Sequence, residues 1–305
     1  MNSKFCHALA ALLGCFLVAG VEPLPQEVAT EPESTSIRFS GEYLAEETFV
    51  GSADVANGRV KVRDFDESDT ILRFVFTPRV KFGVLRLGAE WERFSFDFPS
   101  GAPLPGTLQS VALILGLDTQ FSDSILLRFE AQPGVYNTGL DDLSDDFNMP
   151  FIAGGTYIYN PNLQFVAGVS VDIERQYPVI PAAGIRWKLS RQWVLDAVLP
   201  KPRIEFEWTR DLMLYLGANI KQTNFRVGDD FGVKHGNPRL NHAVLSYGEI
   251  RTGIGFEWKI SKILTLAGEI GYQPYRSFDF YRAGVQFDED GSSAPYGMVS
   301  LHGSF

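Results

Sequence analysis

The residues best suited to chemistry in this chain gather in one segment, Gly228–Ser246. They are Asp229, Asp230, His235, His242 and Ser246. A serine near a histidine and an aspartate could supply a nucleophile, a base and an acid, and so hydrolyse a lipid at the rim of a membrane protein. The same residue types collect in loops because their side chains favour turns, and no Gly-x-Ser-x-Gly motif is present. We therefore predict that the protein is not an enzyme, with lipid modification kept as a hypothesis to test.

A second candidate is the acidic segment Asn137–Asn148, in which a calcium ion could find carboxylate oxygens. Its acidic residues are Asp141, Asp142, Asp145 and Asp146. The ordered ligand spacing of an EF-hand is absent, and so are glycine-rich phosphate loops. A solvated acidic loop explains the segment better, so we predict neither a metal site nor a cofactor.

The elements that must position these residues are β-strands, because apolar and polar residues alternate with a period of two from Thr35 onward. In Leu163–Ile173, every odd-numbered residue is apolar, and the length suits a tilted membrane strand of ~9–11 residues. No stretch shows helical spacing or a long enough apolar run for a transmembrane helix. We predict an all-β fold, a single-chain antiparallel transmembrane β-barrel over residues 35–305.

The connections between the predicted strands alternate in length. Short turns are expected at Thr77–Arg79, Ser122–Ser124, Asn160–Asn162, Ser190–Gln192, Thr209–Asp211 and near Ser261. Longer loops are expected at Val50–Ser68, Pro99–Gly106, Asn137–Asn148, Gln176–Pro181, Gly228–Ser246 and Ser277–Ser293. Outer-membrane barrels have short periplasmic turns and long external loops. Proline interrupts central strands, so Gln192–Trp208 is predicted to form two short strands split at Pro200–Pro202. The total is about 12–14 strands, an even number.

Charged residues recur on the polar faces of these strands. The candidates for lining the lumen are Arg128, Glu130, Asp172, Arg186, Lys221, Glu249, Arg251, Glu257 and Glu269, and His302 is expected there as a structural residue. A lysine or arginine that faces lipid at the bilayer midplane costs ~2–4 kcal/mol, so these faces should turn inward. They could line a water-filled pore, or pair between strands and fill the lumen. A barrel of this size allows both.

Aromatic residues in the apolar register lie within a few residues of the predicted short turns. They are Phe76, Phe121, Tyr159, Trp187, Trp193, Trp208 and Trp258. Amphipathic rings prefer the level of the lipid headgroups, so these positions predict the periplasmic aromatic girdle of a membrane barrel. The core of a soluble barrel would place its rings at strand centres instead.

The N-terminal residues predict export. Residues 1–20 combine a lysine, a short apolar run and small residues at the end, as a secretory signal peptide does. Residues 21–34 are rich in proline and glutamate, so we expect a flexible periplasmic segment. Both cysteines, Cys6 and Cys15, lie in the signal, so the mature chain can form no disulfide; Leu12–Cys15 leaves lipoprotein cleavage open as an alternative. The net charge of −10 argues against nucleic acid as a partner.

Two features resemble known proteins. The final alternating segment ends in Phe305, which resembles the C-terminal assembly signal of Gram-negative outer-membrane β-barrels. The segments Val179–Trp187 and Val198–Arg203, with their Pro, Gly and Trp positions and a Leu-Pro-Lys-Pro-Arg run, resemble a family of uncharacterised outer-membrane barrels described only as a domain of unknown function. The resemblance covers Ile37–Phe305. It implies the fold and the cell outer membrane, with membrane lipid and the assembly machinery as partners, and it implies no catalytic residues.

Three hypotheses about function follow. The first is a pore or transport protein for small solutes, which we favour. The second is a structural or adhesive barrel with a filled lumen, and the third is the lipid-modifying enzyme described above. The sequence identifies neither the solute nor the oligomeric state.

Overall fold

The computed structural model describes residues 40–58, 60–139, 146–291 and 293–305. The predicted signal peptide, the predicted periplasmic segment and three aspartates of the acidic segment (Asp141, Asp142 and Asp145) lie outside the described residues. Within the described residues, no helix is both long and apolar enough to cross a bilayer.

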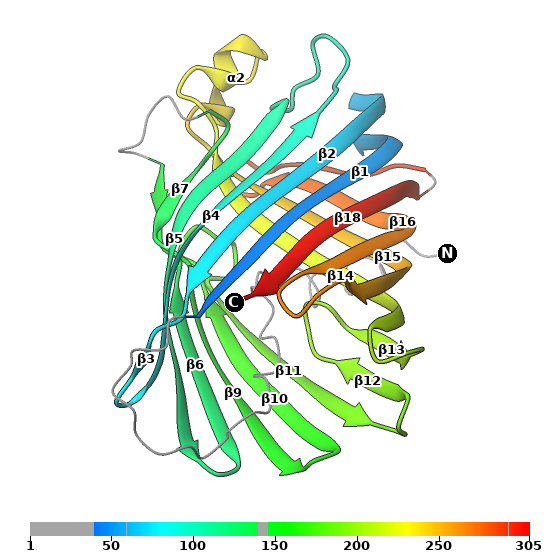
Figure 1. Cartoon of the computed structure of the whole chain (residues 1–305). Coiled ribbons are helices and arrows are strands. Elements are labelled where there is room, and N and C mark those ends of the chain that lie inside the picture. Colours follow the sequence, from blue (N-terminus) through cyan, green and yellow to red (C-terminus); the bar gives the residue numbers. More distant parts are fainter. Residues whose placement is uncertain (1–39, 59, 140–145, 292) are drawn as a thin grey trace.

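The described chain is built from strands that wind obliquely about one axis, with a short helix at one end (Figure 1). The first strands are β1 (Gly41–Asn57), β2 (Val60–Phe76), β3 (Arg79–Val80), β4 (Gly83–Phe96), β5 (Thr107–Ser122), β6 (Ile125–Ala131), β7 (Gly134–Asn137), β8 (Phe147–Asn148) and β9 (Phe151–Asn160). The following strands are β10 (Leu163–Val171), β11 (Val179–Lys188), β12 (Trp193–Ala197), β13 (Arg203–Glu207), β14 (Leu212–Arg226), β15 (Val244–Lys259), β16 (Thr265–Phe280), β17 (Val285–Glu289) and β18 (Ala294–Ser304). Between β14 and β15 lie α2 (Phe231–Lys234) and the 3₁₀ helix η1 (Pro238–Leu240).

These strands form one closed antiparallel barrel. Most strands pair with their neighbours in sequence, and β18 closes the sheet on β1 over nine residue pairs, from Glu42↔Ser304 to Val50↔Tyr296. Three positions in the wall are filled by interrupted strands, β6 with β7, β8 with β9, and β17 with β18, and β3 prolongs β2. Counted in this way, the described wall has fourteen strands. This confirms the predicted fold class, and the strand number lies within the predicted range.

The alternation in the sequence separates the two faces of the wall. Outward residues such as Leu113, Leu216 and Ile254 are 55%, 57% and 58% exposed. Inward neighbours such as Glu249 and Arg251 are buried. Residues 192–208 form the two short strands β12 and β13, joined through Pro200–Pro202 as predicted.

Two of the predicted long loops are wrong. The segment Val50–Ser68 is a continuous hairpin in which β1 and β2 turn near Gly58, and most of Ser277–Ser293 belongs to β16 and β17. The physical reason is that aromatic residues in both segments point into the barrel. Their side chains, Phe65, Phe278, Phe280 and Phe287, are at most 2% exposed, and the sheet extends to bury them.

Candidate functional site

The lumen half near the chain ends and short turns, here called the vestibule, is lined by ion pairs. Its charged residues are Glu42, Arg73, Arg86, Glu90, Asp118, Arg128, Glu130, Asp196, Arg186, Arg203, Glu205 and Glu257. Arg128 binds Asp118 with two hydrogen bonds of 2.6 and 2.7 Å. The register places these two residues directly opposite one another on β5 and β6, so the pairing follows from the strand geometry.

Water reaches part of the vestibule. The side chains of Glu42, Arg203 and Arg186 are 44%, 31% and 26% exposed although they face inward. Arg203 contacts Glu205 at 2.8 Å and Glu257 at 2.6 Å. Other charged side chains of the vestibule are buried in ion pairs, such as Glu130 and Glu205 at 4% and 3% exposed, so the vestibule is polar and partly hydrated.

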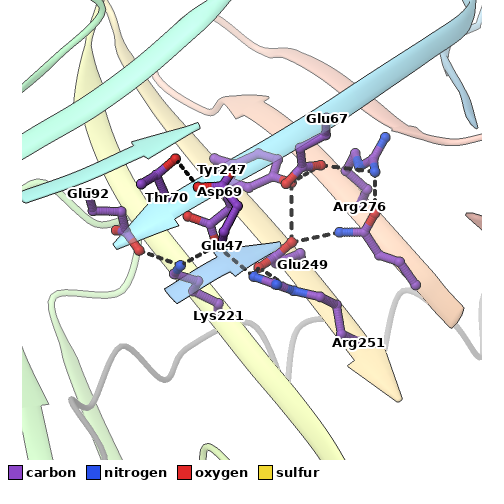
Figure 2. Close-up of polar contacts among 11 residues, drawn as sticks. Glu47, Glu67, Asp69, Thr70, Glu92, Lys221, Tyr247, Glu249, Arg251 and Arg276 are labelled. Atoms are coloured by element: carbon purple, nitrogen blue, oxygen red, sulfur yellow. Dashed lines mark hydrogen bonds and ion pairs between the residues drawn. The ribbon is translucent and has the colours of Figure 1, made fainter. Parts of the chain in front are cut away.

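Between the vestibule and the end of the barrel with the long loops, a buried layer of mainly charged residues crosses the lumen (Figure 2). This ionic layer consists of Glu67, Asp69, Glu92, Lys221, Tyr247, Glu249, Arg251, Gln273 and Arg276. Its centre is Asp69, whose Oδ2 accepts from Arg251 at 2.8 Å and from Lys221 at 3.0 Å. The side chains of Asp69 and Arg251 are 0% and 3% exposed.

The buried side chains of the ionic layer have their partners within the layer. Glu67 accepts from the Tyr247 hydroxyl at 2.8 Å and contacts Arg276 at 2.9 Å, and Glu249 accepts from Gln273 at 2.6 Å. Lys221 also lies 4.5 Å from the ring centroid of Phe94. Charges removed from water must find partners of this kind, because an unpaired buried ion costs several kcal/mol.

Beyond the ionic layer, the loop half of the lumen is filled by an aromatic plug. Its members include Phe65, Phe94, Phe96, Phe225, Tyr247, Phe278 and Phe280, all at most 6% exposed, with Leu240 from η1. Neighbouring rings pack edge to face, for example Phe94 with Tyr247 at 4.9 Å and Phe96 with Phe278 at 5.1 Å, a favoured geometry. The axial path is therefore blocked by side chains from many strands.

Comparison with known proteins identifies the family. Residues 84–292 match the family model described as "Domain of unknown function (DUF6268)". The chain belongs to this family. The match confirms the resemblance drawn from Val179–Trp187 and Val198–Arg203, over a shorter range than expected. No curated protein matches the chain.

Several solved structures are similar in fold. The COG4313 outer membrane channel from Pseudomonas putida F1 is 10% identical, with 91% of this chain and 100% of that chain covered and a TM-score of 0.49. The Pseudomonas putida toluene transporter TodX is 10% identical, with 87% and 89% covered and a TM-score of 0.45. The KdgM porin in complex with disordered oligogalacturonate is 10% identical, with 87% and 99% covered and a TM-score of 0.35.

Most of the predicted lumen residues lie in two places in this DUF6268 barrel. Arg128, Glu130, Arg186 and Glu257 lie in the vestibule, whereas Lys221, Glu249 and Arg251 belong to the ionic layer. Glu269 accepts a hydrogen bond from Tyr296. Asp172 lies just beyond β10 and accepts from Asn148 at 2.9 Å and Asn224 at 2.7 Å. His302 pairs with Leu44 on β1.

The predicted girdle residues lie near the short turns. Phe121, Tyr159, Trp187, Trp193, Trp208 and Trp258 are between 46% and 75% exposed, and Phe76 is half-buried. They lie near the ends of β2, β5, β9, β11, β12, β13 and β15. Their contact with lipid headgroups stays a prediction.

The residues of the enzyme hypothesis do not form a catalytic group. Ser246 is buried on β15, where its hydroxyl donates to Asn224. His242 Nδ1 lies 2.8 Å from Asp229, while His235 Nδ1 lies 2.8 Å from the Phe231 carbonyl oxygen. A hydrogen bond from Lys234 lowers the pKa of the exposed Asp230. Within the described ranges, no cluster of metal-binding side chains is found, and Asp146 accepts from Asn137 at 2.8 Å.

Sequence reasoning does not find Glu67, Asp69 and Arg276. Glu67 lies inside the predicted loop Val50–Ser68, and Asp69 and Arg276 lie directly beside predicted loops. The available signal is that odd-numbered residues of this segment share one face: Phe65, Glu67, Asp69, Ile71 and Arg73. Because this face mixes apolar and charged residues, the alternation of apolar and polar residues expected for a strand is hard to recognise.

Proposed function

We propose that this barrel is an outer-membrane channel for small solutes, closed at its loop end in the state described. The observation that carries the proposal is the division of the lumen. A hydrated vestibule of partly exposed, inward-facing charges meets a dry aromatic plug at the ionic layer. A purely structural barrel gains nothing from a wet half, whereas a channel needs one.

Removing the plug tests this directly. Phe94 and Phe225 are 0% and 1% exposed with their rings 6.1 Å apart. We expect the double variant Phe94→Ala/Phe225→Ala to raise single-channel conductance in planar bilayers at least fivefold over the wild-type chain, because water fills the emptied space.

The matched control is Leu216→Ala, which truncates an outward residue that is 57% exposed and should leave conductance unchanged. Folding of each variant is checked by the slower migration of the boiled barrel in SDS gels. A folded double variant that still seals the membrane would remove the channel proposal.

The second candidate is a structural or adhesive barrel with a filled lumen. The specific observation in its favour is the completeness of the plug, in which rings from β2, β4, β14, β15 and β16 interlock. The same conductance experiment separates the two candidates, since a structural barrel stays closed after the plug is trimmed.

We also propose that the chain resides in the outer membrane with lipid around its apolar face, and that Phe305 is read by the assembly machinery. Phe305 and Gly41 exchange backbone hydrogen bonds of 2.9 and 3.0 Å, while the Phe305 ring is 59% exposed. A backbone bond survives a side-chain change, so the ring is free to serve recognition.

Phe305→Ala should therefore lower the amount of assembled barrel in cells about tenfold, an effect on the order of 1.4 kcal/mol in recognition. The purified variant should refold in detergent like the wild-type chain. Phe121→Ala, which removes another exposed ring near a short turn, serves as the control. Equal membrane levels for both variants would contradict the assignment.

A further inference from the structure

The barrel wall is interrupted above the hairpin of β12 and β13. Each of these strands has five residues, so each rises only about 17 Å along its axis. At a tilt of about 45° this covers roughly 12 Å of an apolar band that is about 25 Å tall. Figure 1 shows both as short arrows beside the long neighbouring strands. At the positions of β12 and β13, the half of the apolar band nearer the long loops therefore has no strand.

The register defines the sides of the interruption. In the described residues, β11 pairs with β12 only from Ile185 to Lys188, so Val179–Gly184 have strand partners on β10 alone. Across the gap, the Ile220 amide donates to the Pro200 carbonyl at 3.0 Å, and the next strand partner of β14 on this side is β7, at Arg226. Along the hairpin itself, three strand spacings separate β11 from β14, which is roughly 14 Å.

A strap closes the interruption at its loop end. This strap, residues 172–174, crosses from β10 to the far side of the gap. The Asp172 carboxylate accepts from Asn224 at 2.7 Å, Glu174 pairs with Arg226 at 2.8 Å, and the Tyr281 hydroxyl donates to the Glu174 carbonyl at 3.1 Å. The interruption in strand pairing is therefore bounded by β11, the β12–β13 turn, β14 and the strap.

The lumen side of this frame differs from the rest of the ionic lumen. Ile152 and Ile180 are buried together, with Ala182 and Leu199 packed against them. Pro150, two residues before Ile152, helps to line a small polar pocket with Gln132, Asn148, Asp172 and Thr223, among others. The Thr223 hydroxyl is buried without a hydrogen-bond partner, which leaves one polar group available to a ligand.

We propose that the interruption is a side portal, through which a small amphipathic molecule passes between the lumen and the outer half of the bilayer. The apolar part of the molecule contacts the Ile152–Ile180–Leu199 cluster, and its polar group is received by the pocket behind. This portal rests on the proposed channel function and gives it a substrate class. It also explains how a channel with a blocked axis can exchange solute.

Single introduced cysteines can be labelled to test the portal. The two cysteines of the sequence, Cys6 and Cys15, both lie in the predicted signal peptide and are absent from a chain expressed without it. A bimane fluorophore is placed at Leu199→Cys, and at Ile71→Cys as the matched control. Ile71 lies on β2 in continuous wall, paired with Glu46 on β1 and Glu92 on β4. In liposomes of brominated-chain lipid, we expect at least twofold stronger quenching at residue 199 than at residue 71. Equal quenching would overturn the portal.

Transport gives the second readout. Cells that express the wild-type chain should take up the fluorescent amine N-phenyl-1-naphthylamine several-fold faster than cells expressing Leu199→Asp, because a carboxylate obstructs the apolar cluster. Gln192→Asp, which adds the same charge in the exposed turn before β12, should keep wild-type uptake. Introducing Leu199→Asp into the plug-trimmed double variant should leave its ion conductance unchanged. If the plug-trimmed double variant does not conduct, the axial channel is refuted. If Leu199→Asp takes up the dye as fast as the wild-type chain, the portal is refuted.

Discussion

Replacing Arg251 by methionine is expected to lower the free energy of unfolding by ~3–5 kcal/mol, the usual cost of breaking a buried ion pair from one side. The side chain of Arg251 is 3% exposed and contacts both Asp69 at 2.8 Å and Glu249 at 3.0 Å. Methionine fills a similar volume but removes the guanidinium group that pairs with the carboxylates of both Asp69 and Glu249. Urea titration of the barrel in liposomes, followed by tryptophan fluorescence, measures the change.

The control for this experiment is Arg191→Met, because Arg191 is exposed in the turn before β12. Surface changes of this kind usually stay within ~0.5 kcal/mol. A further variant, Arg251→Lys, keeps the charge and should recover part of the loss. If Arg251→Met is no more destabilising than Arg191→Met, the ionic layer does not hold the two halves of the lumen together.

Gly271→Val should prevent the wall from closing normally between β15 and β16. An added Cβ at Gly271 would lie 2.6 Å from the Gly253 Cα and closer still to the Thr252 carbonyl oxygen. Both are backbone atoms of the paired strand, so neither can move away as a flexible side chain would. Overpacking typically costs ~1–3 kcal/mol, and backbone contact places this case at the upper end.

The neighbouring strand supplies the comparison for this variant. Gly297 pairs with Ile270, and no atom lies within 4 Å of a Cβ built there. Gly297→Ala should therefore fold with wild-type yield, whereas Gly271→Ala loses stability and Gly271→Val gives little folded barrel by gel mobility. Similar yields for Gly271→Val and Gly297→Ala would show that the strands separate more easily than the contacts imply.

Local alternation was enough to predict most of the wall. The series in Leu163–Ile173 became β10, and Pro200–Pro202 marked the boundary between β12 and β13. Both inferences depend on rules that act over a few residues. The same rules failed in Val50–Ser68 and Ser277–Ser293, because several of the inward residues there are aromatic instead of polar.

The contacts within the site could not be predicted from spacing. Lys221 and Asp69 are 152 residues apart in sequence, and Tyr247 and Glu67 are 180 apart. Only closure of the barrel brings these side chains to one level. The aromatic plug is hidden for the same reason, since Phe94, Phe225 and Phe278 each read as one more apolar residue in a membrane strand.

The pairing of Gly41 with Phe305 has a consequence for how the polypeptide could be re-engineered. Because the first and last residues of the sheet are hydrogen bonded to each other, a short linker could join them, and new ends could be cut in the segment around α2. Such a circular permutant keeps every ladder of the barrel while moving its terminal aromatic elsewhere. It would separate the information that specifies the finished shape from the information that delivers the chain to its membrane.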